Sequence, residues 1–158
     1  KIGFFDSGVG GISVMSYARE EIKNADYIYY ADTDHVPYGK KNPEEVVRYS
    51  EAAVGCLVEQ GADIVVVACN TATSMAIETL RKTFSVPIIG MEPAVKPASV
   101  KHHGEKILVC ATPLTIAGEK LHHLIDENYA GCAYPTLAAL PELSRKTPCS
   151  ISRQSRLI

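Results

Sequence analysis

The chain has 158 residues, a length that suits one ordinary domain or one domain with part of a second. Its hydrophobic content of 46% and charged content of 22% are typical of a soluble globular protein with a sizeable core. A net charge of −2 gives no electrostatic reason to expect binding to nucleic acid or to an anionic membrane. No apolar run approaches the length of a membrane span, and the five cysteines show no CxxC spacing, so we expect reduced thiols and no metal site.

The first half of the chain alternates short apolar runs with helical patterns. Strands are expected at 1–5, 26–31, 63–69 and 86–91, and helices at 12–23, 43–60 and 72–82. Asn42, Pro43 and Glu45 form a capping signature at the start of the second helix, and Gly61 follows its end. This order, with short connections, predicts an α/β fold with a parallel sheet and right-handed crossovers.

The second half gives a weaker pattern. A short helix from Ala94, a fifth strand at 106–111 and a helix at 116–128 indicate the beginning of a second α/β lobe. Prolines interrupt the chain beyond residue 129, and residues 144–158 are polar and basic without a structural period. We therefore expect a first lobe at 1–93, a partial second lobe at 94–143 and an irregular, mobile tail at 144–158.

Residues 64–74 form the segment around which we expect the chemistry to be organised. A β-branched run from Ile64 to Ala68 is typical of a buried strand, and Cys69, Asn70 and Thr71 follow it at the start of the next helix. This edge of an open α/β sheet is where ligands bind. The N–H groups and the dipole of the helix favour a thiolate there, so we expect a reactive cysteine. The alternative is that the cysteine is a small buried core residue.

Polar residues also follow neighbouring strands, and we expect them at the same edge. A carboxylate, an amide, a thiol and several hydroxyls beside helix N-termini suit a small zwitterion, because N–H groups and hydroxyls hold a carboxylate while an aspartate holds an ammonium. Alternatively, Asp6 and Ser7 cap a helix, and Tyr38 is an ordinary turn aromatic. The residues concerned are Asp6, Ser7, Pro37, Tyr38, Gly39, Asn70, Thr71 and Thr112.

A dinucleotide site is a weaker alternative. The segment Gly8-Val9-Gly10-Gly11 follows the first strand, and Asp32 at the end of the second could bind a ribose. The dinucleotide fingerprint requires a glycine where Ser13 stands, and Asp6 would bring a carboxylate close to the pyrophosphate. Both features argue against nucleotide binding.

Four motifs together resemble the glutamate racemases, within the wider aspartate/glutamate racemase superfamily. They occur in the order and spacing of that family over about residues 2–128. The motifs are FDSGVGG at 5–11, ADT at 31–33 with PYG at 37–39, VACNTA at 67–72 and ATPLT at 111–115. The resemblance implies two similar α/β lobes with the active site between them. On this basis the chain is expected to hold a three-layer first lobe of that type and an incomplete second lobe.

The resemblance also implies an activity, the cofactor-independent interconversion of L- and D-glutamate in the bacterial cytoplasm, which supplies D-glutamate for peptidoglycan. In that mechanism one cysteine thiolate removes the α-proton from one face, and a second cysteine, as thiol, returns a proton to the other. Carried over by motif, Cys69 is the acid/base of the first lobe, and Asp6 assists it. The substrate-binding residues implied are Asp6, Ser7, Pro37, Tyr38, Gly39, Cys69, Asn70, Thr71 and Thr112.

The chain departs from the family in its last part. No Gly-Cys-Thr-His segment carries a second cysteine, and neither Cys132 nor Cys149 is followed by Thr-His. The likeness ends near residue 143, which leads to the hypothesis of a truncation or frame change. An inactive homologue that only binds an amino acid or a partner, and a one-cysteine enzyme such as a decarboxylase, remain alternatives. An unfinished second lobe leaves apolar surface and a bare strand edge, which predicts a homodimer.

Overall fold

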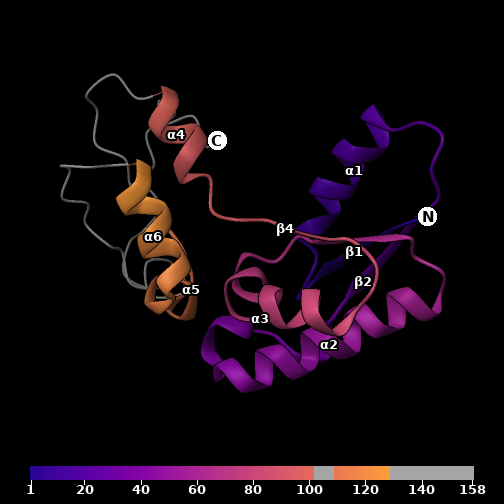
Figure 1. Ribbon diagram of the computed structural model, residues 1–158, viewed down its shortest axis with the longest axis horizontal. Coiled ribbons are helices and arrows are strands. Elements are labelled where there is room, and N and C mark those ends of the chain that lie inside the picture. Colours follow the sequence, from indigo (N-terminus) through magenta and orange to yellow (C-terminus); the bar gives the residue numbers. More distant parts are fainter. Residues whose placement is uncertain (102–108, 129–158) are drawn as a thin grey trace, which may run out of the picture.

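A four-stranded parallel sheet lies at the centre of the computed structural model, which describes residues 1–101 and 109–128 (Figure 1). The spatial order of the strands is β2-β1-β3-β4. The strands are β1 (Ile2–Asp6), β2 (Tyr27–Ala31), β3 (Ile64–Val67) and β4 (Ile88–Gly90). The prediction of a parallel α/β sheet is confirmed, although β3 and β4 are shorter than the sequence pattern predicts.

Helices connect the strands and continue beyond the sheet. α1 (Gly11–Glu21), α2 (Pro43–Glu59) and α3 (Asn70–Thr83) follow the first three strands, as predicted. Two 3₁₀ turns, η1 (Thr33–His35) and η2 (Tyr38–Lys40), lie between β2 and α2. The chain then forms α4 (Val95–Lys101), α5 (Pro113–Ala117) and α6 (Glu119–Asn128).

The ends of α2 follow the local sequence signals closely. The Asn42 side chain accepts a hydrogen bond from the Glu45 N–H at 2.8 Å, and the Glu45 carboxylate accepts one from the Asn42 N–H at 3.2 Å. This reciprocal pair is a capping box, with Pro43 in the first turn. Gly61, with φ of 84°, adopts the left-handed conformation that favours glycine just past a helix.

The single helix predicted at 116–128 is wrong in its start and in its continuity. Thr112 caps α5 through its hydroxyl, which accepts a hydrogen bond from the Thr115 N–H at 3.3 Å. Gly118 has an extended ψ of 132° and separates α5 from α6. A side chain there would also meet Ser74 Oγ of α3 at 2.6 Å, so the break brings the backbone close to α3. The strand predicted at 106–111 and the tail at 144–158 lie largely or wholly outside the described residues.

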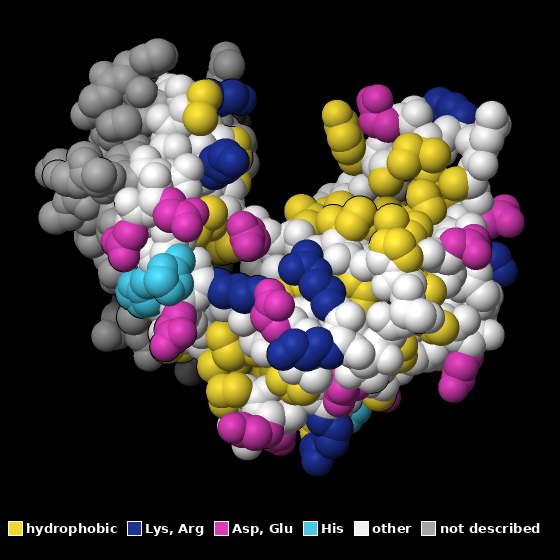
Figure 2. Space-filling model, in the orientation of Figure 1, with side chains coloured by type: hydrophobic (Ala, Val, Ile, Leu, Met, Phe, Trp, Pro, Cys, Tyr) yellow, Lys and Arg dark blue, Asp and Glu magenta, His cyan; other side chains and the backbone are white. Residues whose placement is uncertain are grey.

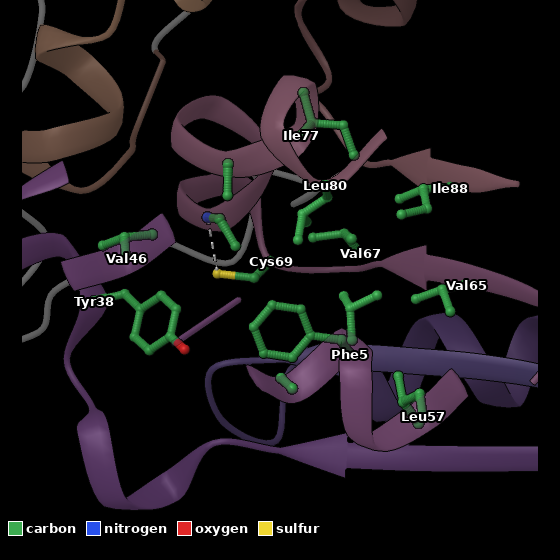
Figure 3. Packing of buried hydrophobic residues seen from close by; sticks show 14 of the residues in the cluster. Phe5, Tyr38, Val46, Leu57, Val65, Val67, Cys69, Ile77, Leu80 and Ile88 are labelled. Atoms are coloured by element: carbon green, nitrogen blue, oxygen red, sulfur yellow. Dashed lines mark hydrogen bonds between the residues drawn. The ribbon is translucent and has the colours of Figure 1, made fainter. Parts of the chain in front are cut away.

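One face of the sheet is fully closed by helices. Phe5, Val65, Val67 and Ile88 point toward α2 and α3, and all four are buried (Figure 3). They pack with side chains of both helices, such as Leu57 and Leu80. This arrangement is the usual one in parallel sheets, whose strands are apolar because helices cover them.

The opposite face is closed only over part of its width. Residues that pair across the four strands form one row on this face, and the row runs Tyr29, Phe4, Val66 and Ile89 from β2 to β4. Phe4 is 1% exposed beneath α1, whereas Ile89 on β4 is 49% exposed. Within residues 1–101 and 109–128, α1 is the helix that packs on this face, against β1 and β2.

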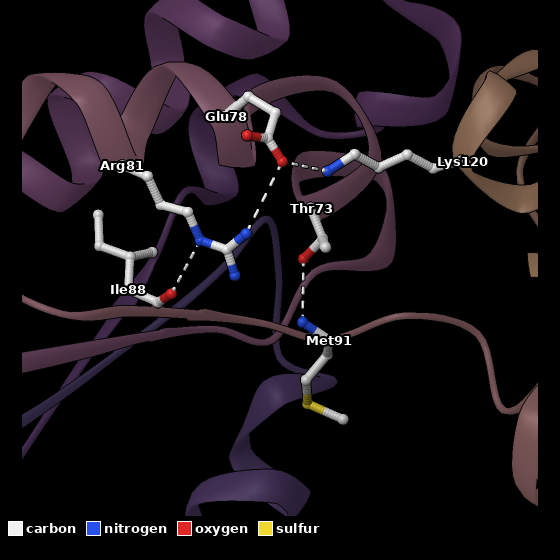
Figure 4. A network of polar contacts seen from close by, with 6 residues as sticks. All are labelled: Thr73, Glu78, Arg81, Ile88, Met91 and Lys120. Atoms are coloured by element: carbon white, nitrogen blue, oxygen red, sulfur yellow. Dashed lines mark hydrogen bonds and ion pairs between the residues drawn. The ribbon is translucent and has the colours of Figure 1, made fainter.

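The helices after the sheet have a small buried cluster of their own. Val95 of α4 packs with Leu121 and Ile125 of α6, apart from the main core. A polar network joins α6 to α3, since Lys120 Nζ lies 3.0 Å from Glu78 Oε1 (Figure 4). Arg81 extends it by donating from Nε to the Ile88 carbonyl at 3.3 Å. None of the helices in the described ranges is long and apolar enough to cross a membrane.

Candidate active site

Cys69 lies between the end of β3 and the first turn of α3, where the sequence pattern predicts it. Its side chain is buried, at 7% exposure, among residues of the main core (Figure 3). The Ala72 N–H donates a hydrogen bond to Cys69 Sγ at 3.5 Å, and Ser7 Oγ lies 3.4 Å from the same sulfur. The thiol therefore caps α3 and contacts a hydroxyl from the end of β1.

The pKa of this thiol is shifted in the direction opposite to the one that the sequence predicts. Burial raises the pKa of Cys69 above its usual value, and the nearby Asp6 carboxylate raises it further. Hydrogen bonds from Ser7 and from the Ala72 N–H lower the pKa but do not reverse the effect. The prediction that the helix terminus favours the thiolate is thus wrong in its net direction, because desolvation outweighs the helix N–H groups.

Asp6 is a buried carboxylate at the end of β1. Its Oδ2 accepts a hydrogen bond from the Gly11 N–H at 3.0 Å, so it stabilises the start of α1. This approach requires glycine, because a β-carbon on Gly11 would lie 2.9 Å from both Asp6 Cβ and Ala68 Cβ. Asp6 therefore makes the helix-capping contact that the sequence offers as the alternative to a role in ligand binding. It also lies close enough to Cys69 to raise the pKa of the thiol.

Tyr38 is buried in the main core and does not reach into solvent. Its ring packs against Phe5 with ring centroids 6.3 Å apart, and it is 2% exposed. Its hydroxyl donates to Asp32 Oδ2 at 2.6 Å, and His35 Nδ1 lies 2.7 Å from the other oxygen of Asp32. Burial and then the bond to Asp32 raise the pKa of Tyr38. Both carboxylate oxygens of Asp32 therefore have partners within the protein. Neither oxygen is free to bind a ribose, which argues against the dinucleotide alternative.

Three threonine hydroxyls meet between the N-termini of α3 and α5, and we call them the hydroxyl triangle. The Oγ1 atoms of Thr71 and Thr112 are 3.0 Å apart, those of Thr71 and Thr115 3.1 Å, and those of Thr112 and Thr115 3.0 Å. Sequence reasoning missed Thr115. Its position one helical turn after the cap Thr112 was the signal that could have found it.

The remaining predicted residues surround these groups. Gly39 lies against the hydroxyl triangle, because a β-carbon there would clash with the side chain of Thr112. Asn70 is exposed in the first turn of α3, and Pro37 is exposed beside Tyr38. Cys132 and Cys149 lie outside the described residues. Within residues 1–101 and 109–128, no three His, Cys, Asp or Glu side chains come together as metal ligands would.

The sheet order and the polar groups together define a class. The chain is an open parallel α/β protein in which a thiol, a carboxylate and threonine hydroxyls gather at the carboxyl ends of the strands, the usual ligand edge of such sheets. Comparison with known proteins narrows the class. The model of the Asp/Glu/Hydantoin racemase family matches residues 13–155, and the chain belongs to that family.

Individual relatives agree with this assignment. The chain is 52% identical to a glutamate racemase of Lachnospira eligens over 92% of its own length and 55% of the relative's. It is 55% identical to that of Halothermothrix orenii over 80% of its length and 50% of the relative's. The chain thus spans about half the length of the curated relatives it matches.

Solved structures give the same result for the fold. Glutamate racemase from Aquifex pyrophilus superposes with a TM-score of 0.79 at 40% identity, over 87% of this chain and 54% of that one. The Escherichia coli enzyme, solved in complex with L-glutamate and the activator UDP-MurNAc-Ala, gives a TM-score of 0.82 at 32% identity, over 90% of this chain and 55% of that one. The racemase-type α/β fold is therefore established for the part of the family that this chain covers.

Proposed function

We propose that this chain acts in glutamate racemisation, the cofactor-independent interconversion of L- and D-glutamate that supplies D-glutamate for bacterial peptidoglycan. One observation carries the proposal, the buried Cys69 thiol beside Ser7 at the strand ends. The chain that carries this thiol is 52% and 55% identical to two curated glutamate racemases. The substrate follows from those names and from the L-glutamate bound to the Escherichia coli relative.

Cys69 is the proposed acid/base on one face of the substrate. As thiolate it takes the α-proton, which leaves a carbanion at the α-carbon and a Cys69 thiol. A second acid on the opposite face then donates a proton, and the reverse reaction exchanges the two roles. Because burial raises the pKa of Cys69, the thiol form prevails at neutral pH, and this form suits the proton-donating step.

The α-proton of an amino acid is a weak acid, so the developing negative charge has to be stabilised by donors that are already in place. The first turn of α3 and the hydroxyl triangle offer N–H groups, the Asn70 amide and the Thr71 and Thr112 hydroxyls. We propose that these groups hold the substrate carboxylates. Asp6 and Ser7 then lie beside the reacting carbon, and Pro37, Tyr38 and Gly39 form the wall next to Thr112.

The experiment that tests the proposal is α-proton exchange of L-glutamate in deuterated water, followed by NMR and chiral analysis of the product. Exchange with formation of D-glutamate supports racemisation. Exchange with retained L configuration means that Cys69 works as a base on one face only, as in a one-cysteine enzyme. A folded chain that gives no exchange refutes the proposal.

Two cysteine variants assign the reaction to its residue. Cys69→Ser should abolish exchange because serine is far too weak an acid to replace the thiol. It should leave glutamate binding largely intact. Cys56→Ser, on α2, is the matched control and should keep wild-type exchange. Equal exchange by both variants would remove Cys69 from the mechanism.

We further propose the finer features that the family relation supports. The first lobe extends over residues 1–93 and a partial second lobe over 94–143, consistent with the separate buried clusters of the sheet and of α4 with α6. The bacterial relatives support a location in the bacterial cytoplasm. Exposed apolar side chains on the sheet and on α1 support a homodimer.

A further inference from the structure

The turn between β1 and α1 carries Ser7, whose hydroxyl contacts the sulfur of Cys69. The sheet fixes one side of this turn, since Asp6 is the last residue of β1 and pairs with β2. The helix fixes the other side, since α1 begins at Gly11. Two of the four residues between these points are glycines, which allow the backbone of the turn many conformations. Contacts from outside the turn are therefore needed to hold Ser7 in one place.

Tyr29 of β2 provides such a contact from the neighbouring strand. It pairs with Phe4 in the sheet, but its side chain reaches past the end of β1. Its hydroxyl donates a hydrogen bond to the Gly8 carbonyl at 3.0 Å. The same oxygen lies 3.0 Å from the place of a β-carbon on Gly11. One side chain thus joins the middle of the turn to β2 and packs against the start of α1.

The Tyr29 hydroxyl keeps its proton at neutral pH, so it is a constant donor. Figure 2 shows hydrophobic side chains gathered around the start of α1. The pKa of Tyr29 is raised to about 12, first by burial and then by the Asp6 carboxylate, although the backbone N–H groups of Gly11 and Ile12 lower it. Below this pKa the phenol carries no charge, so removal of its hydroxyl changes no charge in the site.

The hydrogen bond at Gly8 acts on the thiol through one peptide unit. Gly8 follows Ser7 directly in the chain, and Ser7 Oγ lies 3.4 Å from Cys69 Sγ. A movement of the turn by about 1 Å is enough to end that contact, and a misplacement of this size near a reacting atom can lower a rate by up to about 100-fold. The placement of Gly8 therefore matters to the chemistry at Cys69.

We propose that Tyr29 is a positioning residue for proton transfer at Cys69, because its hydrogen bond to the Gly8 carbonyl holds the Ser7 hydroxyl against the sulfur. For turnover the inference rests on the proposed racemase function. The contact between Ser7 and the thiol exists without substrate, so the positioning role has a readout of its own. Tyr29 acts through the backbone of the turn and not on the reacting carbon.

Two variants on the same strand separate positioning from stability. Tyr29→Phe keeps the ring and removes the donor to Gly8. Tyr27→Phe is the matched control, because Tyr27 lies two residues earlier on the same face and donates to the carbonyls of Ala18 at 3.2 Å and Ile22 at 2.7 Å, at the far end of α1. Each variant loses a hydroxyl that bonds backbone carbonyls, so both should lower the urea midpoint. The Tyr29 variant alone should affect the thiol.

Alkylation of Cys69 as a function of pH, followed on its peptide by mass spectrometry, measures the thiol without substrate. The hydrogen bond from Ser7 lowers the pKa of Cys69, so Tyr29→Phe should raise the alkylation midpoint and Tyr27→Phe should not. In a Ser7→Ala background Tyr29→Phe should raise it no further, because the contact is already lost. An unchanged midpoint in Tyr29→Phe, or an equal rise in the Ser7→Ala background, refutes the positioning role.

Proton exchange of L-glutamate in deuterated water gives the second readout. Tyr29→Phe should lower kcat at least about fivefold and leave KM within about twofold of the wild type, because the groups proposed to hold the carboxylates lie on α3 and α5. Tyr27→Phe should keep the wild-type kcat. An equal loss of kcat in both variants means general destabilisation and refutes the positioning role. A folded wild type that gives no exchange refutes the racemase proposal instead, and the alkylation result then decides the role of Tyr29.

Discussion

Gly11 lies where α1 begins and packs tightly against the strand ends, and its replacement by alanine tests that packing. A β-carbon at this position would lie 2.9 Å from Ala68 Cβ, 2.9 Å from Asp6 Cβ and 3.0 Å from Tyr29 Oη. Two of these atoms are β-carbons fixed to strand ends, so no side-chain rotation can relieve the contact. The helix has to move away from the sheet, and Gly11 is the only buried residue of α1.

The expected cost follows from the size of this conflict. Forcing an extra methyl group into a packed site costs about 1–3 kcal/mol. Alanine has an advantage over glycine of up to about 1 kcal/mol inside a helix, and less at its first residue, so it does not offset the conflict. We expect Gly11→Ala to lower the free energy of unfolding by about 1–3 kcal/mol.

Urea unfolding followed by circular dichroism measures this difference, provided that the denaturant slope is unchanged. Gly8→Ala is the matched control in the same turn, because a β-carbon there has no atom within 4 Å. It should leave stability unchanged, or raise it by up to about 1 kcal/mol through the lower entropy of the unfolded chain. A Gly11→Ala variant as stable as the wild type would refute the close packing of α1 on the sheet.

Three further predictions concern the polar groups. Ser7→Ala removes a hydrogen bond that lowers the pKa of Cys69, so alkylation of this thiol, followed by mass spectrometry, should titrate at higher pH; an unchanged or lower midpoint contradicts the contact. Tyr38→Phe leaves one oxygen of buried Asp32, Oδ2, without its donor and should cost about 1–3 kcal/mol in urea unfolding, whereas a neutral result would mean that water replaces the hydroxyl. Burial raises the pKa of Tyr29 to about 12, against about 10 in the unfolded chain, so the folded state holds this proton more tightly. Stability should therefore fall as pH rises from about 10 to about 12. Tyr29→Phe should flatten that fall, and an identical slope would argue against the shift.

Most elements of the sheet could be predicted because their signals are local. Apolar runs of four to six residues mark the strands, and the capping box of Asn42 and Glu45 marks the start of α2. The break at Gly118 could not be predicted, since a glycine inside a helical pattern is tolerated. It depends on the approach of Gly118 to Ser74 of α3, a contact between residues far apart in the sequence.

The candidate site shows the same division between local and long-range information. The place of Cys69 at a strand-to-helix junction was predictable, and so was the nearness of Ser7, because parallel strands end at one edge. The direction of the pKa shift was not, because burial depends on the packing of the whole core around the sulfur. The bond between Tyr38 and Asp32 also depends on how two turns fold over the sheet end.

The hydroxyl triangle affects which kind of ligand binds beside it. Each hydroxyl has one proton, so three hydroxyls in a ring can each donate to one neighbour and accept from the other. Such a ring can run in either sense, and all of its protons are used while nothing is bound. When a bound carboxylate accepts a hydrogen bond from the Thr112 hydroxyl, one side of the ring opens, and Thr71 and Thr115 stay bonded to each other. Binding then exchanges one internal hydrogen bond for a charge-assisted one, which is the stronger of the two. A neutral amide oxygen gains no such advantage, so the ring favours an anion over a neutral group of the same shape.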